Sequence, residues 1–110
     1  MKGLKIRKNP FSGGLAVVLD EPICNKDETG DPHYVVAYFL NHSVGDEPDY
    51  VELETETSLT ERGYDYRANN FEKSLVPRRK VSEFLRREKE RYMSRGYEEY
   101  TENGGIQNAN

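Results

Sequence analysis

Short stretches of alternating or β-branched apolar residues run through the first two thirds of the chain and predict β-strands. The cleanest alternation sets Val51 and Leu53 against Glu52 and Glu54, which is the period of a half-buried strand. The most apolar stretch, YVVAYFL, predicts an interior strand. Gly, Pro and Asn between the stretches predict turns. The predicted strands cover residues 3–8, 15–20, 33–41, 49–59 and 64–68, and residues 71–77 are expected to return along the sheet.

After Pro77 the spacing of apolar residues changes to the period of a helix. We predict an amphipathic helix over about residues 80–97, which ends near Gly96 because glycine readily adopts the left-handed backbone that follows a helix. Residues 101–110 are rich in Gly and Asn and predict a disordered tail after a single domain of residues 1–100. The stripe expected to face the core consists of Val81, Phe84, Leu85, Glu88 and Tyr92.

Short strands joined by tight turns cannot bury their apolar sides as a flat ribbon, so we expect a curled sheet or a small barrel. The predicted fold class is mainly β (α+β): a five-stranded antiparallel barrel of the SH3-like type, or a curled sheet, followed by one C-terminal helix. DYVEL at 49–53 and YDYRA at 64–68 resemble fragments of the SH3 domain family. That family has them in the reverse order and carries paired Trp in its peptide groove. This chain has no Trp, so the resemblance implies no peptide-binding function.

Composition narrows the class of protein further. The 110 residues fit one domain, and 33% of them are charged. The longest apolar run is too short to span a bilayer, and no apolar run follows the basic N-terminus to make a secretory signal. Cys24 is the only cysteine, which excludes an internal disulfide and favours a reducing compartment, the cytoplasm.

The net charge of −4 conceals a segregation of charge along the chain. Residues 1–19 carry +4, residues 20–66 carry −11, residues 67–95 carry +6 and residues 96–110 carry −3. Such blocks influence association more than folding. Two interpretations stay open: the basic ends pack beside the acidic middle of the same molecule, or the blocks face different partners.

Residues that could carry catalysis or hold a metal are few. Cys24, His33 and Asp31 flank one loop, but no glycine turn or helix N-terminus is predicted there to activate the thiol. Asp27, Glu28 and Asp31 lack the register of a calcium loop. One Cys and two scattered His cannot form a structural zinc site. We therefore predict no enzyme, no cofactor and no metal.

Two charged surfaces are candidates for binding. Arg86, Arg87 and Arg91 belong to the basic segment Arg78–Arg95, which could contact nucleic acid or could be a solvated helix face. Glu52, Glu54 and Glu56 recur every second residue, so a strand would place them about 6.8 Å apart, a spacing similar to that of nucleic-acid phosphates. Such an acidic row could occupy a basic protein, or could be an ordinary exposed face.

The chain contains eight Tyr, a residue enriched at protein interfaces. Tyr50 and Tyr97 are the candidates for a protein contact. The function expected from these features is a non-enzymatic protein-interaction module, such as a small regulator or inhibitor of a larger host complex of the kind made by bacteriophages. The alternative is a nucleic-acid-binding accessory protein that uses the basic helix. The partner's identity and the oligomeric state stay open.

Overall fold

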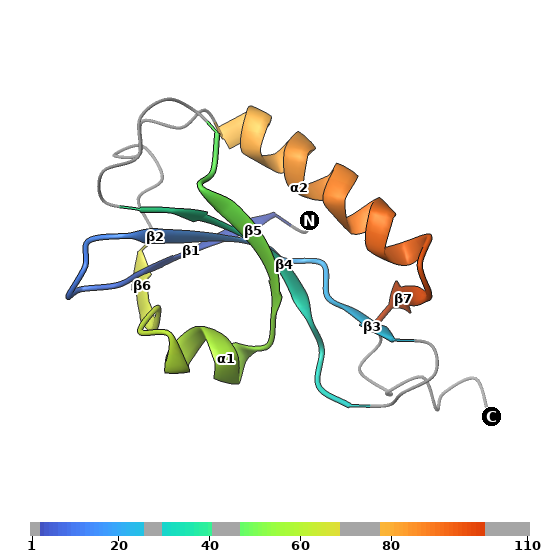
Figure 1. Ribbon diagram of the computed structural model, residues 1–110, viewed down its shortest axis with the longest axis horizontal. Helices are drawn as coiled ribbons and strands as arrows, with labels where there is room; N and C mark the ends of the chain where they lie inside the picture. Colours follow the sequence, from blue (N-terminus) through green and yellow to red (C-terminus); the bar gives the residue numbers. More distant parts are fainter. Residues whose placement is uncertain (1–2, 26–29, 41–46, 69–77, 101–110) are drawn as a thin grey trace.

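The computed structural model describes residues 3–25, 30–40, 47–68 and 78–100, and the statements that follow concern these residues. They form seven strands and two helices, shown in Figure 1. The strands are β1 (Leu4–Lys8), β2 (Leu15–Leu19), β3 (Ile23–Asn25), β4 (Tyr34–Phe39), β5 (Tyr50–Glu54), β6 (Tyr66–Ala68) and β7 (Tyr97–Glu99). The helices are α1 (Glu56–Glu61) and α2 (Arg78–Met93).

Five of the strands form one antiparallel sheet in the order β5-β4-β2-β1-β6. The prediction of a mainly β, α+β fold with a five-stranded antiparallel sheet and a C-terminal helix is therefore confirmed. Within the described part of the chain, β5 and β6 are the two edges and do not pair, so the sheet is curled and does not close into a barrel. The apolar stretch 34–39 forms an interior strand, as predicted, although β2 occupies the middle position.

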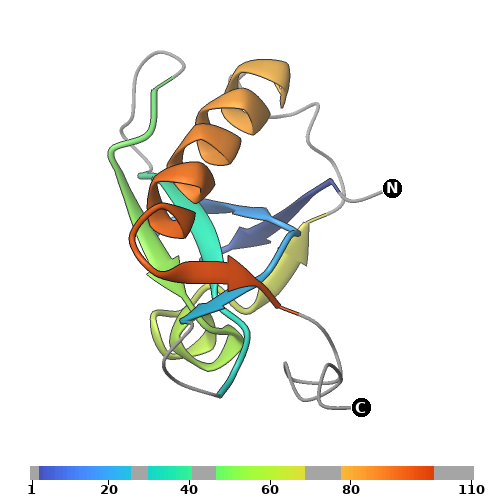
Figure 2. The ribbon, with the colours of Figure 1, turned by 90° about the vertical axis from the view of Figure 1, so that its right-hand side faces the viewer.

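Both faces of the sheet are covered, and this explains why all six residues of β4 are buried. Figure 2 shows α2 against one face and α1 on the other side. Val17, Val35 and Ala37 alternate along their strands and pack against Val81 and Leu85 of α2. Residues at the intervening positions point toward α1, where Val36, Tyr38, Leu59 and Tyr64 form a second core with their neighbours Ala16, Val18 and Tyr34.

Helix α2 buries the predicted stripe to different depths. Leu85 is fully buried and Val81 nearly so, whereas Phe84 and Tyr92 are only partly buried at the margin of the core. The helix ends at Met93, before the predicted residue 97, and Gly96 then takes a φ of 108°. The prediction that the helix extends to 97 is wrong because the chain turns there and continues as β7.

The prediction of one strand over residues 49–59 is also wrong in its second half. Strand β5 ends at Glu54, and Thr55 begins α1 as its N-cap. The Thr55 side chain accepts a hydrogen bond from the Ser58 backbone N–H at 3.1 Å, and Ser58 Oγ accepts one from the Thr55 N–H at 2.9 Å. This reciprocal capping satisfies two backbone donors and stabilises a helix start where apolar alternation alone predicts a strand.

A small two-stranded ribbon of β3 and β7 was not predicted. Ile23 lies opposite Glu99 and Asn25 opposite Tyr97, so the end of the described chain pairs with the segment that follows β2. The ribbon lies at one end of α2 (Figure 2). The predicted return of residues 71–77 and the predicted tail of residues 101–110 lie outside the described residues.

Candidate functional site

A groove of about 600 Å³ lies between α2, from Lys80 to Glu88, and edge strand β5 with the residues that precede it. Helix α2 packs over β4 and β2 and supplies one wall, and the neighbouring edge strand β5 supplies the other (Figure 1). The residues that line the groove are Glu47, Pro48, Tyr50, Val51, Lys80, Val81, Phe84, Arg87 and Glu88.

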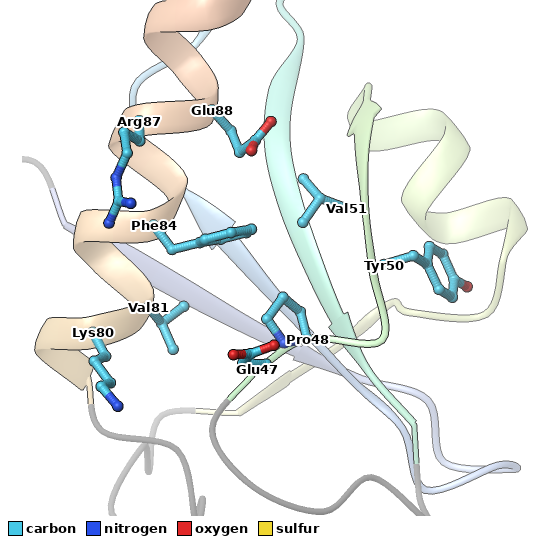
Figure 3. Close-up of a pocket in the computed structure, with 9 residues that line it drawn as sticks. All are labelled: Glu47, Pro48, Tyr50, Val51, Lys80, Val81, Phe84, Arg87 and Glu88. Atoms are coloured by element: carbon cyan, nitrogen blue, oxygen red, sulfur yellow. The ribbon is translucent and has the colours of Figure 1, made fainter.

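The floor of the groove is apolar. Figure 3 shows the Phe84 ring directed toward β5 and the Val51 side chain directed back toward α2, with Val81 and Pro48 beside them. Phe84 and Val51 are both partly exposed, and they extend the core that Val81 and Leu85 close beneath them. The groove is thus an opening onto the α2 core, with apolar surface available for a bulky side chain.

Charges of both signs surround this floor. Glu88 forms an ion pair with Arg91 at 3.1 Å, and Lys80 is engaged in an interaction within the protein. Glu47 and Arg87 are exposed, and within the described part of the chain neither has an ion-pair partner. Glu47 lies near the first turn of α2, and Arg87 lies farther along the helix (Figure 3).

The backbone of β5 provides a second feature of the same wall. Strand β5 pairs only with β4 among the described strands, so its outer edge carries peptide groups that no described strand satisfies. An edge strand offers alternate N–H and C=O groups to an added strand. The free edge and the apolar floor lie side by side, which is the arrangement that an extended peptide requires.

The acidic residues Glu52, Glu54 and Glu56 do not form a continuous exposed row. Glu54 is 4% exposed and accepts hydrogen bonds from Tyr38 Oη at 2.7 Å and Ser58 Oγ at 2.6 Å. Its carboxylate also pairs with Arg62 Nε at 2.9 Å. Burial, and then the hydrogen bond and charge of Glu54, raise the pKa of Tyr38 far above its ordinary value. Glu54 therefore ties α1 to the sheet.

The other two glutamates lie in different settings. Glu56 is in the first turn of α1, where its two carboxylate oxygens each accept a hydrogen bond from Arg7 at 3.0 Å. The Arg7 side chain is 4% exposed, so this bidentate pair satisfies a buried cation of β1. Glu52 is the only one of the three that stays on a partly exposed strand position without such a contact among the described residues.

Much of the charge on the basic helix is compensated within the molecule. Arg86 pairs with Glu21, and Lys89 is held between Glu21 at 3.0 Å and Glu99 at 2.6 Å. Burial alone would lower the pKa of Lys89, but the hydrogen bonds to Glu99 and Glu21 outweigh it and raise that pKa. Burial alone would raise the pKa of Glu21, but the hydrogen bonds and charges of Lys89 and Arg86 outweigh it and lower that pKa. These pairs join separate charge blocks of the sequence, as the intramolecular interpretation expects.

The two predicted contact tyrosines are placed differently. Tyr50 borders the groove, but its ring points to the other side of β5, where it stacks on Tyr38 with the ring centroids 4.9 Å apart (Figure 3). Tyr97 lies in β7, and its ring meets Tyr92 of α2 edge to face at 5.5 Å. Of the predicted binding residues, only Tyr50 and Arg87 line the groove.

The Cys24 region lacks the features of an activated nucleophile. Burial, and then the charge of Glu98, raise the pKa of the Cys24 thiol, which lowers the fraction of thiolate at neutral pH. His33 lies opposite Ile23, and its buried Nδ1 has no hydrogen-bond partner among the described residues. Within the described residues, no three His, Cys, Asp or Glu side chains gather as a metal site would require. Asp27 and Glu28 lie outside these residues.

The sequence pattern identified the stripe of α2 but not the groove. Phe84 was expected to face the core and Val51 to lie on the apolar side of its strand. Both stay partly open because α2 packs over β4 and β2 and leaves the edge strand β5 less covered. No helix in the described part of the chain is long and apolar enough to cross a membrane.

No protein-family model matches this chain. Searches of curated proteins and of solved structures likewise return no significant match.

Proposed function

We propose that this protein is a non-enzymatic protein-interaction module that binds an extended segment of a partner protein along the outer edge of β5. The observation that carries the proposal is the groove of about 600 Å³ with an apolar floor beside that edge. Backbone hydrogen bonds to β5 would supply affinity, and alternate side chains of the added segment would enter the groove. By occupying a segment of a larger complex, a chain of this size can act as its regulator or inhibitor.

The groove supports this function better than it supports catalysis. Its walls combine apolar surface with a few peripheral charges, as binding sites for peptide side chains do. Ion pairing of Arg86, Lys89 and Arg91 within the molecule reduces the positive charge that α2 offers to phosphates. A protein partner is therefore favoured over nucleic acid.

A selection from a random-sequence peptide library tests the proposal. Peptides that bind the immobilised protein should be extended and contain a bulky apolar residue, and their affinities are measured by fluorescence anisotropy. Phe84→Ala removes groove surface and should weaken binding by at least about 10-fold. Phe11→Ala is the matched control, because Phe11 is 95% exposed at the β1–β2 turn, outside the groove.

Two results would contradict the proposal. The first is a selection that yields no binding peptide, and the second is equal binding by Phe84→Ala and Phe11→Ala proteins of unchanged secondary structure. Sub-micromolar, salt-sensitive binding of random-sequence DNA or RNA would instead favour the nucleic-acid alternative.

We also propose that the curled sheet is of the SH3-like type. The pairing of β6 with β1 and the short helix α1 between β5 and β6 support this, since they bring the last strand of the sheet back to the first. The proposal concerns architecture alone and assigns no ligand. The single cysteine supports a protein of the cytoplasm.

A further inference from the structure

The charges around the groove differ in how far they are satisfied. Glu88 is neutralised by Arg91 at 3.1 Å, and Lys80 takes part in an interaction of its own. Exposed Glu47 and exposed Arg87 have no ion-pair partner within the described residues. The two charges that the groove can still offer to a ligand are therefore of opposite sign.

These two charges lie at different points along the groove. Figure 3 shows Glu47 on the β5 side of the groove, near the first turn of α2. The Arg87 side chain starts farther along α2, on the side of the helix away from β5, and points back toward Lys80, so that Val81 and Phe84 lie between its guanidinium and Glu47. A ligand that crosses the groove from Glu47 to Arg87 would pass the carboxylate first, the apolar floor next and the guanidinium last. Side chains on one face of an extended segment recur about every 6.8 Å, so one segment can reach all three.

We propose that the groove selects an extended partner segment that carries a bulky apolar residue flanked by a basic residue on one side and an acidic residue on the other. The basic residue lies beside Glu47 and the acidic residue beside Arg87. This inference rests on the proposed function and specifies the orientation of the bound segment. A segment bound in the opposite orientation would place like charges together.

Charge reversal tests the inference in the full-length protein. Peptides selected on the wild type should be enriched in an acidic and a basic residue on opposite sides of the apolar one. Arg87→Glu should weaken binding of these peptides by roughly 5- to 10-fold, as expected for an exposed ion pair replaced by a repulsive one. Peptides in which the acidic residue is replaced by Lys should bind Arg87→Glu better than the wild type. Glu47→Arg should produce the same exchange for the basic residue.

Two further substitutions control for net charge. Arg95→Glu changes an exposed cation beyond the end of α2, and Glu61→Arg changes an exposed anion of α1 on the other side of the sheet. Neither should alter the preference of the peptides. Salt titration should reduce the effect of Arg87→Glu, because such pairs are screened.

The outcomes separate the inference from the proposed function. Selected peptides that lose affinity with Phe84→Ala but keep the same charge preference with Arg87→Glu and Glu47→Arg would overturn the inference and leave the binding groove in place. A selection without charge enrichment would overturn it as well. A selection that yields no peptide would overturn both.

Discussion

At the scale of single residues, the sequence places Glu54 on the correct face of its strand but wrongly predicts that this face is exposed. The alternation of β5 correctly opposes Glu54 to Leu53, but the face it occupies is covered by α1. Three hydrogen-bonding partners satisfy its buried carboxylate. Burial depends on α1 folding back over the sheet, and no periodicity within β5 can indicate that.

Replacing Glu54 should therefore destabilise the protein and not merely change its surface. We expect Glu54→Ala to lower the free energy of unfolding by about 2–4 kcal/mol, because it leaves Tyr38 Oη and Arg62 without their partner. Glu52→Ala, on the partly exposed neighbouring position, should cost less than about 1 kcal/mol. Urea denaturation measures both, and equal losses would contradict the buried network.

The ion-pair cluster of Glu21, Arg86, Lys89 and Glu99 should make stability depend on pH. The folded protein lowers the pKa of Glu21 below its ordinary value of 4.5, so the stabilisation by this carboxylate is present above that value and is lost as pH falls through the lowered pKa. Glu21→Gln should reduce stability at about pH 7 and should show a smaller further loss at about pH 3 than the wild type.

Glu90→Gln, at an exposed position of α2, is the control and should follow the wild-type dependence on pH. Urea denaturation at several pH values provides the comparison. An acid-induced loss of stability that is unchanged in Glu21→Gln would show that this ion-pair cluster does not contribute.

At the scale of elements, local signals predicted strands β1, β2 and β4 and helix α2. Alternation marks β1, apolar runs with β-branched residues mark β2 and β4, and helical spacing marks α2. They failed where two signals compete. Residues 55–59 continue the alternation of β5, but the capping residues Thr55 and Ser58 start a helix there. Strands β3 and β7 have only three residues each, too few for a period to be visible.

The two faces of α2 give a prediction that separates packing from binding. Leu85→Ala should lower the free energy of unfolding by about 2–5 kcal/mol, because Leu85 is fully buried in the core beneath the helix. Phe84→Ala should cost about 1–2 kcal/mol, because the ring is already partly open to the groove. Thermal and urea unfolding measure both variants. A larger loss of stability in Phe84→Ala than in Leu85→Ala would show that Phe84, not Leu85, is the more deeply buried residue of α2.

At the scale of the whole molecule, long-range contacts determine which charges pair and where the groove forms, and the sequence pattern does not predict either. Lys89 links α2 to Glu21 and Glu99, and β7 pairs with β3, so segments far apart in the chain meet at one end of α2. The groove arises in the same way, since α2 packs over β4 and β2, beside β5. Composition indicated charge blocks, but their mutual neutralisation depends on this arrangement.

Truncation tests the role of the β3–β7 ribbon. A chain that ends at Tyr100 should melt at the wild-type temperature, because the composition of residues 101–110 predicts a disordered tail. A chain that ends at Gly96 loses β7 and the Glu99 partner of Lys89, and it should melt at least about 5 °C lower. Equal melting temperatures for the two chains would show that the ribbon is not part of the cooperative unit.

In the proposed complex, a partner segment adds to β5 as a strand. The most direct measurement is an N-methyl scan of a peptide selected on the wild type, in which each backbone amide is methylated in turn and its affinity is measured. Only alternate amides of an added strand donate to the neighbouring edge. Strand addition should cause large losses of affinity at every second position along the part of the peptide that lies beside β5, and small effects between them. Uniform losses, or losses without a period of two, would contradict strand addition.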